Sequence, residues 1–355
     1  MTESQDISAE LQHRVKEAAN SGTTLQIVGG GTKSFYGRSV SGIPLSVSSH
    51  CGIISYEPGE LVLSARSGTP LADIEEVLAA SNQMLAFEPP HMGDSATLGG
   101  AIATGLSGPR RPYSGAARDF VLGIKLINGS ADVMRFGGQV MKNVAGYDVS
   151  RLMAGALGTL GILLEISLKV LPRPAAEQTL VQHRTPDDAI EAMNAWAGRP
   201  LPLSGCCYDG NRLYVRLSGT QSAVRAAHAK LGGETLPDAS AFWQSLREQR
   251  STFFDGPLPL WRLAVPAACA PMKLSGKWLL DWGGAQRWLR SDGDASVIRQ
   301  AAAQVGGHAT LFRGGDRGGE VFHPLAPELL ALHRRIKEAM DPQHIFNPGR
   351  MYLDL

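Results

Sequence analysis

The chain has 355 residues, 43% of them hydrophobic and 19% charged, with a formal net charge of +1, values ordinary for a soluble globular protein of two domains. So small a charge excludes a field that would attract nucleic acid or a membrane surface. The four cysteines include no CxxC pair, which excludes the usual zinc or iron–sulfur spacing, and no apolar run approaches the ~18 residues of a membrane span.

The first half of the chain alternates short strands with helices. Residues 8–20 predict an amphipathic helix, and a second helix over 70–82 starts at a proline, a favoured first-turn residue. Strands are predicted at 25–28, 44–50, 52–58 and 61–68. Residues 87–115 predict a loop, and its unusual length indicates a functional segment.

A hairpin and a strand close this half. Asn128-Gly129, a strong turn signal, predicts a hairpin across residues 119–138. Residues 148–170 then predict a helix, a bend of small residues and a strand from Ile162 to Val170. Two prolines follow this strand and mark the first domain boundary.

The second half repeats hairpins and helices. Hairpins are predicted to turn at Asp209-Gly210 and Gly283-Gly284, with helices and single strands between and after them. This pattern predicts an antiparallel sheet with helices on one face. The last 30 residues predict an amphipathic helix and an irregular end.

The segment "QIVGGGTKSFYG" at 26–37 invites comparison with known phosphate-binding loops. The P-loop motif fails because Thr32 precedes Lys33, and the dinucleotide motif fails because Ser34 stands where a third glycine is needed. Successive glycine N–H groups still form a nest for anionic oxygens. The alternative is a strand-to-strand turn with no ligand.

Two further glycine segments strengthen the ligand interpretation. "DSATLGGAIATGLSG" at 94–108 again combines glycines with hydroxyls, and "GALGTLGIL" at 155–163 brings three glycines to the approach of a strand. Close helix–strand packing is the alternative for the latter. Two or three such loops in one domain favour a single ligand long enough to touch them all.

These segments together resemble the FAD-linked oxidase family, of the vanillyl-alcohol-oxidase type. The chain ending "IKEAMDPQHIFNPGRMY" is also similar to the common ending of that family. The resemblance implies an α+β fold, with a PCMH-type FAD-binding domain of two α+β subdomains and a smaller antiparallel-sheet cap. The implied limits are 1–174 for the FAD domain, 175–325 for the cap and 326–355 for a segment returning to the FAD domain.

The resemblance also implies which residues contact FAD. The glycine loop would grip the pyrophosphate, the second segment would pass over the flavin, and the third would contact the adenine half. The implied contacts are Gly29, Gly30, Gly31, Thr32, Lys33, Ser34, Pro90, Thr97, Leu98, Gly99, Gly100, Thr104, Gly105, Gly108, Gly158, Gly161, Ile162 and Asn347. Family members with covalent flavin often carry a histidine in or just after the glycine loop, and its absence here predicts non-covalent FAD.

A narrower resemblance, carried by "GPRRPYSGAARDFVLG" and "RFGGQVMKNVAGYDVSRLMAGALGTLG", is to the FAD-binding subunits of bacterial glycolate oxidases. It implies a larger FAD-containing subunit and an iron–sulfur subunit as partners, with a small 2-hydroxy acid as substrate of the complex. With the cysteine usage, it predicts a cytoplasmic chain, peripheral to the inner membrane face through its complex. No nucleic acid, metal or transmembrane segment is expected.

Catalytic candidates are polar residues expected near the flavin. Lys142, Tyr147 and Arg350 are the three predicted, and Arg110 and Arg111 are open to interpretation as either flavin-facing or an interface pair. The histidine-rich "H-x-GDGN-x-H" segment of single-chain 2-hydroxyacid dehydrogenases is missing. Two alternatives therefore stay open: a self-sufficient FAD-dependent 2-hydroxyacid dehydrogenase, and a flavin-bearing scaffold without redox turnover.

Overall fold

The computed structural model describes residues 3–138 and 148–355, which form two compact units. The first comprises Met1–Leu106, Ala116–Pro172 and Arg317–Leu355, and the second Ser107–Gly115 and Arg173–Asp316. The short segment Ser107–Gly115 thus belongs to the second unit, although its neighbours in sequence belong to the first. The limits at 174 and 325 implied by the family resemblance stay a prediction.

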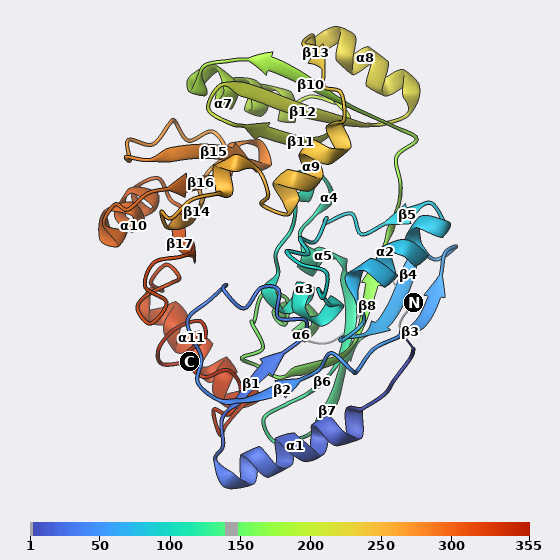
Figure 1. Ribbon diagram of the computed structural model, residues 1–355, viewed down its shortest axis with the longest axis vertical. Coiled ribbons are helices and arrows are strands. Elements are labelled where there is room, and N and C mark those ends of the chain that lie inside the picture. The colour runs from blue at the N-terminus through green and yellow to red at the C-terminus, as the bar shows by residue number, and fades with distance from the viewer. Residues whose placement is uncertain (1–2, 139–147) are drawn as a thin grey trace. The chain divides into compact units, whose positions relative to one another are not determined.

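The first unit contains a five-stranded sheet, a parallel strand pair and several helices (Figure 1). Its elements are α1 (Ser8–Ser21), β1 (Leu25–Val28), β2 (Ile43–Ser46), β3 (Ile53–Glu57), β4 (Val62–Arg66), α2 (Leu71–Ala80), β5 (Gln83–Met84), α3 (Leu98–Thr104), α5 (Ala117–Phe120), β6 (Val121–Ile127), β7 (Val133–Gly137), α6 (Val149–Leu152), β8 (Ile162–Lys169), β9 (Leu171–Pro172) and α11 (Pro327–Met340).

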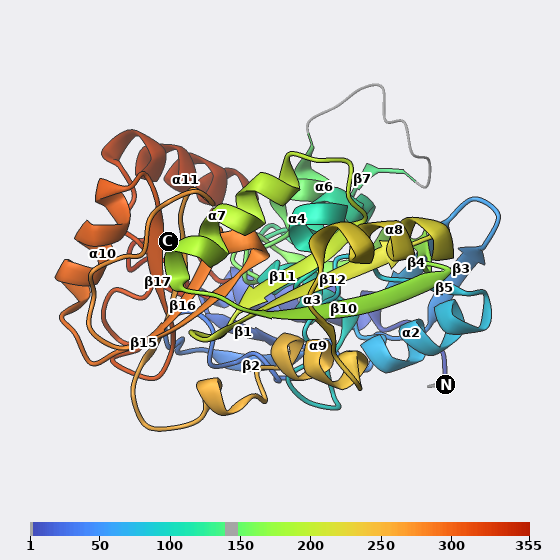
Figure 2. The ribbon, with the colours of Figure 1, turned by 90° about the horizontal axis from the view of Figure 1, so that it is seen from above.

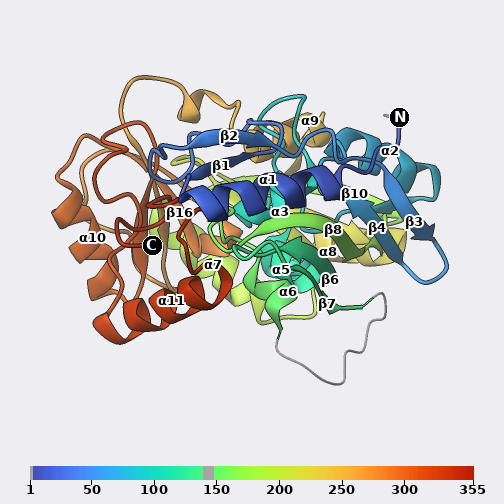
Figure 3. The same cartoon turned by 90° about the horizontal axis from the view of Figure 1, so that it is seen from below.

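Two apolar clusters hold this unit together. The antiparallel sheet has the strand order β3-β4-β8-β6-β7, and α2 and α3 pack against it through a core that includes Ile74, Ile102 and Ile166. The other cluster joins α1 to β1, β2 and the first residues of β8 (Figure 3). Because β1 and β2 are parallel, the chain must cross over between them, and the glycine loop lies in that crossover.

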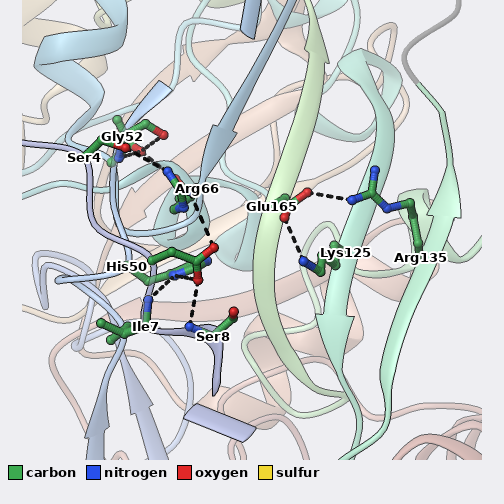
Figure 4. Close-up of polar contacts among 11 residues, drawn as sticks. Ser4, Ile7, Ser8, His50, Gly52, Arg66, Lys125, Arg135 and Glu165 are labelled. Carbon is green, nitrogen blue, oxygen red and sulfur yellow. Dashed lines mark hydrogen bonds and ion pairs between the residues drawn. The ribbon is translucent and has the colours of Figure 1, made fainter. Parts of the chain in front are cut away.

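Polar contacts fasten the N-terminal segment to this unit (Figure 4). The Arg66 guanidinium donates to Ser4 Oγ at 2.9 Å, and the backbone N–H of Ile7 donates to His50 Nδ1 at 3.2 Å. His50 is 1% exposed, and its burial lowers the pKa of the imidazole below its usual value. The Ser8 hydroxyl and backbone N–H lower the pKa of Asp6 to about 2.

Helix α3 corrects the prediction of a continuous loop over 87–115. Thr97 caps it, its hydroxyl accepting from the backbone N–H of Gly100 at 3.2 Å, and Gly105 ends it with a left-handed φ of 61°. Glycine has a low helix propensity, which is why Gly99-Gly100 suggested a loop. A Cβ on Gly99 would lie 2.7 Å from Ser67 Cβ, so close packing against the strand end requires glycine there.

The second unit is built on one antiparallel sheet of order β13-β10-β12-β11-β15-β16-β14-β17. Its elements are α4 (Arg111–Ser114), β10 (Ala176–His183), α7 (Pro186–Ala197), β11 (Leu203–Tyr208), β12 (Arg212–Gly219), α8 (Gln221–Leu231), β13 (Glu234–Thr235), α9 (Ala239–Arg247), β14 (Leu260–Ala264), β15 (Lys277–Asp281), β16 (Gln286–Arg290), α10 (Ala295–Gln304), β17 (His308–Arg313) and two 3-10 turns at Thr252–Phe254 and Trp282–Gly284.

Helices cover both faces of this sheet, which corrects the prediction of one covered face (Figure 2). Val215 of β12 belongs to the cluster with α7 and α8. Its neighbour Tyr214 points to the other face and stacks on Phe242 of α9, with ring centroids 4.1 Å apart. The turns predicted at Asp209-Gly210 and Gly283-Gly284 are confirmed, and Gly210, Gly283 and Gly284 all have positive φ.

Candidate functional site

A cavity in the first unit is walled by all three glycine segments and encloses about 970 Å³, counting its open mouth. Most of the residues that the family resemblance implied for FAD lie on its wall. These are Gly29, Gly30, Gly31, Thr32, Lys33, Ser34, Thr97, Gly99, Gly100, Thr104, Gly158, Gly161, Ile162 and Asn347, joined by Arg350.

The first glycine loop supplies backbone donors. Among the described residues, no acceptor receives a hydrogen bond from the backbone N–H of Gly29, Gly30 or Gly31. A Cβ on Gly30 would lie 1.5 Å from the Ser95 carbonyl oxygen, so the loop's course requires glycine. At Gly31 the reason differs, because φ is +70° and the space around the missing Cβ is open. Three adjacent unused N–H groups at a cavity wall are the nest that an anion needs.

Side chains of this loop bind the neighbouring loop. The Thr32 hydroxyl donates to the His91 carbonyl at 2.7 Å, and Lys33 Nζ donates to the same oxygen at 3.0 Å. The Ser95 hydroxyl donates in return to the Gly30 carbonyl at 2.7 Å. We call these contacts the interloop clasp; they join the two segments at the cavity wall. Lys33 is only 7% exposed, so its charge lies within this clasp.

The second glycine segment, at 94–108, shapes the cavity wall and offers few free hydrogen-bond donors. The first N–H groups of α3 are already used: Leu98 donates to Thr69, Gly99 to Ser67 and Gly100 to the Thr97 hydroxyl. Gly99 and Gly100 therefore bring backbone close to the cavity without offering these groups to a ligand. The cavity therefore favours the anionic group of a ligand at the first glycine loop and not at the start of α3.

The third segment and the chain's end meet at Asn347. Asn347 Oδ1 accepts from the backbone N–H of Ile27 at 2.9 Å, and Nδ2 donates to the Leu157 carbonyl at 2.7 Å. A Cβ on Gly158 would lie 2.7 Å from Nδ2. Arg350 donates to the carbonyls of Ser34, Tyr36 and Arg38, and its burial lowers the pKa of the guanidinium. Both side chains bind the backbone of the cavity wall, and the catalytic role of Arg350 stays a prediction.

Some predicted residues lie elsewhere. Leu98 is fully buried in the core and Pro90 is buried, while Gly105 ends α3; these three are not on the cavity wall. Gly108 belongs to the second unit, where its carbonyl accepts from Trp282 Nε1 at 3.0 Å. The two catalytic candidates Lys142 and Tyr147 lie outside the described residues, and their role stays a prediction.

The arginines of segment 107–115 are engaged inside the second unit. Arg110 pairs with Glu177 at 2.7 Å, and the Arg111 guanidinium lies 4.3 Å from the ring centroid of Trp282. Burial and the neighbouring Cys206 raise the pKa of Tyr113 well above its usual value. These contacts fasten the segment to its unit.

Sequence reasoning missed the remaining residues of the wall. They are Gln26, Ile27, Val28, Val47, Ser67, Ala103, Met153, Leu157 and Leu163. Most of these residues are apolar and lie close in sequence to a glycine. Proximity to a glycine motif was therefore the feature of the sequence that could have identified them. Ser67 follows β4 directly, is fully buried, and its hydroxyl has no hydrogen-bond partner among the described residues.

This wall fits FAD. Unused N–H groups at one segment suit the pyrophosphate, and glycines whose Cβ atoms would strike neighbouring protein atoms let the segments pack closely around the cavity. The apolar side chains suit flat aromatic rings. Among the described residues, no helix is long and apolar enough to cross a membrane, and no group of three His, Cys, Asp or Glu side chains could hold a metal ion.

Comparison with known proteins agrees with this geometry. Residues 7–137 match the family described as "FAD binding domain", and residues 320–351 match "FAD linked oxidases, C-terminal domain". Glycolate oxidase subunit GlcE of Escherichia coli (strain K12) is 49% identical over 99% of each chain. Glycolate oxidase subunit GlcD of Bacillus subtilis (strain 168) is 33% identical over 36% of this chain and 27% of that protein.

A solved structure shows the same fold. Alkyldihydroxyacetonephosphate synthase matches with a TM-score of 0.66 at 15% identity, covering 97% of this chain and 75% of that chain. The α+β fold implied by the sequence resemblance is thereby confirmed. With the full-length relative and the two family matches, it follows that the chain belongs to the family of FAD-linked oxidases and binds FAD.

Proposed function

We propose that this chain is the FAD-binding subunit of a complex that oxidises glycolate, and related small 2-hydroxy acids such as D-lactate, to the 2-oxo acid. The observation that carries the proposal is the full-length similarity to a glycolate oxidase subunit, joined to a cavity in which the FAD motifs converge. Bound FAD supplies the two-electron acceptor for oxidation of the alcohol carbon.

The protein's own residues hold the cofactor. The N–H groups of Gly29, Gly30 and Gly31 bind the pyrophosphate, the interloop clasp fixes their direction, and the apolar wall takes the rings. We propose that no covalent bond forms, because the loop carries Thr32 and Lys33 where covalent members of the family often have histidine, and Lys33 is committed to the clasp.

The partners are proposed from the same relative. A larger FAD-containing subunit would provide the substrate site, and an iron–sulfur subunit would receive the electrons, with this chain relaying them or supporting assembly. The complex would lie in the cytoplasm, at the inner face of the membrane. Cell fractionation with and without the partner subunits tests that location, since this chain should leave the membrane fraction when they are deleted.

The decisive assay compares the purified chain with the complex in which its partners are co-expressed. Glycolate and a dye acceptor are supplied, and FAD is counted in each preparation. We expect FAD in the isolated chain, turnover only in the complex, and one FAD fewer when the glycine loop is altered. Substantial turnover by the isolated chain would support a self-sufficient dehydrogenase. A bound flavin that never becomes reduced in the active complex would indicate a scaffold.

A further inference from the structure

The tail of the chain contains a buried ion pair whose every proton is used. Lys337 and Asp341 are 1% and 0% exposed, and Lys337 Nζ lies 2.7 Å from Asp341 Oδ2. The same ammonium donates to the Thr159 carbonyl at 2.8 Å and the Phe346 carbonyl at 2.9 Å. A buried pair is tolerated only when such bonds satisfy both charges, so this geometry is tightly constrained.

The carboxylate in turn orders the turn that follows α11. Asp341 accepts from the backbone N–H of Ile345 at 3.1 Å and of Phe346 at 2.8 Å. Phe346 forms a parallel bridge with Leu25 of β1, so the segment that follows α11 lies beside this strand. The next residue, Asn347, is held with a left-handed φ of 42°.

Asn347 then joins two walls of the FAD cavity. Its backbone N–H donates to Leu25 at 3.0 Å, and its side-chain amide bridges the Ile27 N–H and the Leu157 carbonyl. Ile27 stands two residues before the first glycine loop, and Leu157 directly precedes Gly158. One amide therefore sets the separation of two segments that are far apart in sequence.

We propose that Lys337, Asp341 and Asn347 form a staple that sets the width of the FAD cavity, with Asn347 as a positioning residue for the cofactor. This proposal rests on the assignment of the cavity to FAD. Its consequence is that residues near the end of the chain control FAD affinity by fixing the glycine loop against the 157–158 turn. A role in fold stability alone would leave the affinity of the folded protein unchanged.

A double-mutant cycle between Asn347 and Gly158 tests this. Asn347→Ala should weaken FAD binding about tenfold, the equivalent of roughly one lost hydrogen bond. Gly158→Ala should weaken it as well, because the new Cβ would displace the Asn347 amide from 2.7 Å and because alanine is strained at a φ of +71°. The double variant should lose less FAD affinity than the product of the two single losses. The clash between the new Cβ and the Asn347 amide is absent once that amide is removed. Kd is measured by quenching of flavin fluorescence, beside urea unfolding of the FAD-free protein.

Two further variants keep the test decisive. Asn347→Asp retains the size and the acceptor for Ile27 but cannot donate to Leu157, so it should also weaken FAD binding even where the alanine variant fails to fold. His344→Ala is the matched control, because His344 is exposed in the same turn and pairs only with Glu338 among the described residues. It should bind FAD like the unaltered chain.

The outcomes separate this proposal from the cofactor assignment. Normal Kd values in folded Asn347 variants, or losses that multiply in the cycle, would overturn the staple while leaving the FAD site intact. Failure of the unaltered chain to bind FAD would instead overturn the cofactor site and the proposed function with it.

Discussion

Gly31 offers a way to test the anion nest by charge alone. A Cβ there meets nothing within 4 Å, and the residue lies on the cavity wall with a φ of +70°. Aspartate and asparagine tolerate that left-handed conformation better than other residues and have nearly the same shape. Gly31→Asp and Gly31→Asn therefore share any strain and differ only by a negative charge facing the proposed pyrophosphate.

The expected size of the difference follows from electrostatics. A carboxylate about 6 Å from a phosphate charge is repelled by about 1.5 to 3 kcal/mol at an effective dielectric constant of ~20 to ~40. Since each 1.4 kcal/mol changes affinity about tenfold, the aspartate variant should bind FAD roughly 10- to 100-fold more weakly than the asparagine variant. Salt should narrow the gap, because the cavity opens to solvent.

The assay is titration of the FAD-free chain with FAD, followed by flavin fluorescence at low and high ionic strength. Riboflavin, which lacks the pyrophosphate, is the matched ligand and should not distinguish the two variants. Equal Kd values for FAD in both would refute the nest at Gly29–Gly31. A gap that persists with riboflavin would refute the placement of the phosphates there.

Three further predictions concern the stability of the glycine loop, the attachment of FAD to the protein, and the pH dependence of stability. Gly30→Ala should lower the free energy of unfolding by about 2 kcal/mol or more, because its Cβ would strike backbone at 1.5 Å, and urea titration should detect this loss. Acid precipitation should leave FAD in the supernatant; a yellow pellet would contradict a non-covalent site. His50 has a pKa below its usual 6.5, so its stabilising effect is present above pH 6.5 and is lost as pH falls below that value. Urea unfolding at pH 7.5 and 5.5 should show this loss, and His50→Gln should reduce it; an undiminished pH dependence in that variant would contradict the assignment.

Local turn chemistry made parts of the fold predictable. Asp209-Gly210 and Gly283-Gly284 predicted their hairpins because left-handed residues are confined to a few residue types. Helix α3 was missed because the low helix propensity of two glycines outweighed the capping signal of Thr97. Glycine is needed there because Gly99 packs against Ser67. The placement of α9 on the second face of its sheet depends on Tyr214 and other non-local contacts that a single sequence does not display.

The candidate site was likewise predictable only in part. The glycine segments were recognisable because their spacing reflects backbone conformation. The roles of Lys33 and Asn347 were not, since each depends on a carbonyl from a distant segment, that of His91 and that of Leu157. Both lie on the cavity wall, and their contact with the cofactor stays a prediction.

The glycines of the two loops therefore serve different physical purposes, although their sequences look alike. At Gly29–Gly31 the backbone N–H groups have no partner among the described residues, so the loop carries unused hydrogen-bonding capacity. At Gly99-Gly100 the N–H groups are satisfied, and glycine is needed at Gly99 for close approach to Ser67. Gly31→Asp should act through charge and be sensitive to salt, whereas Gly99→Ala should act through packing and be insensitive to it. Comparing the salt dependence of FAD binding in Gly31→Asp and Gly99→Ala separates the two purposes, and equal salt slopes would show that the loops share one role.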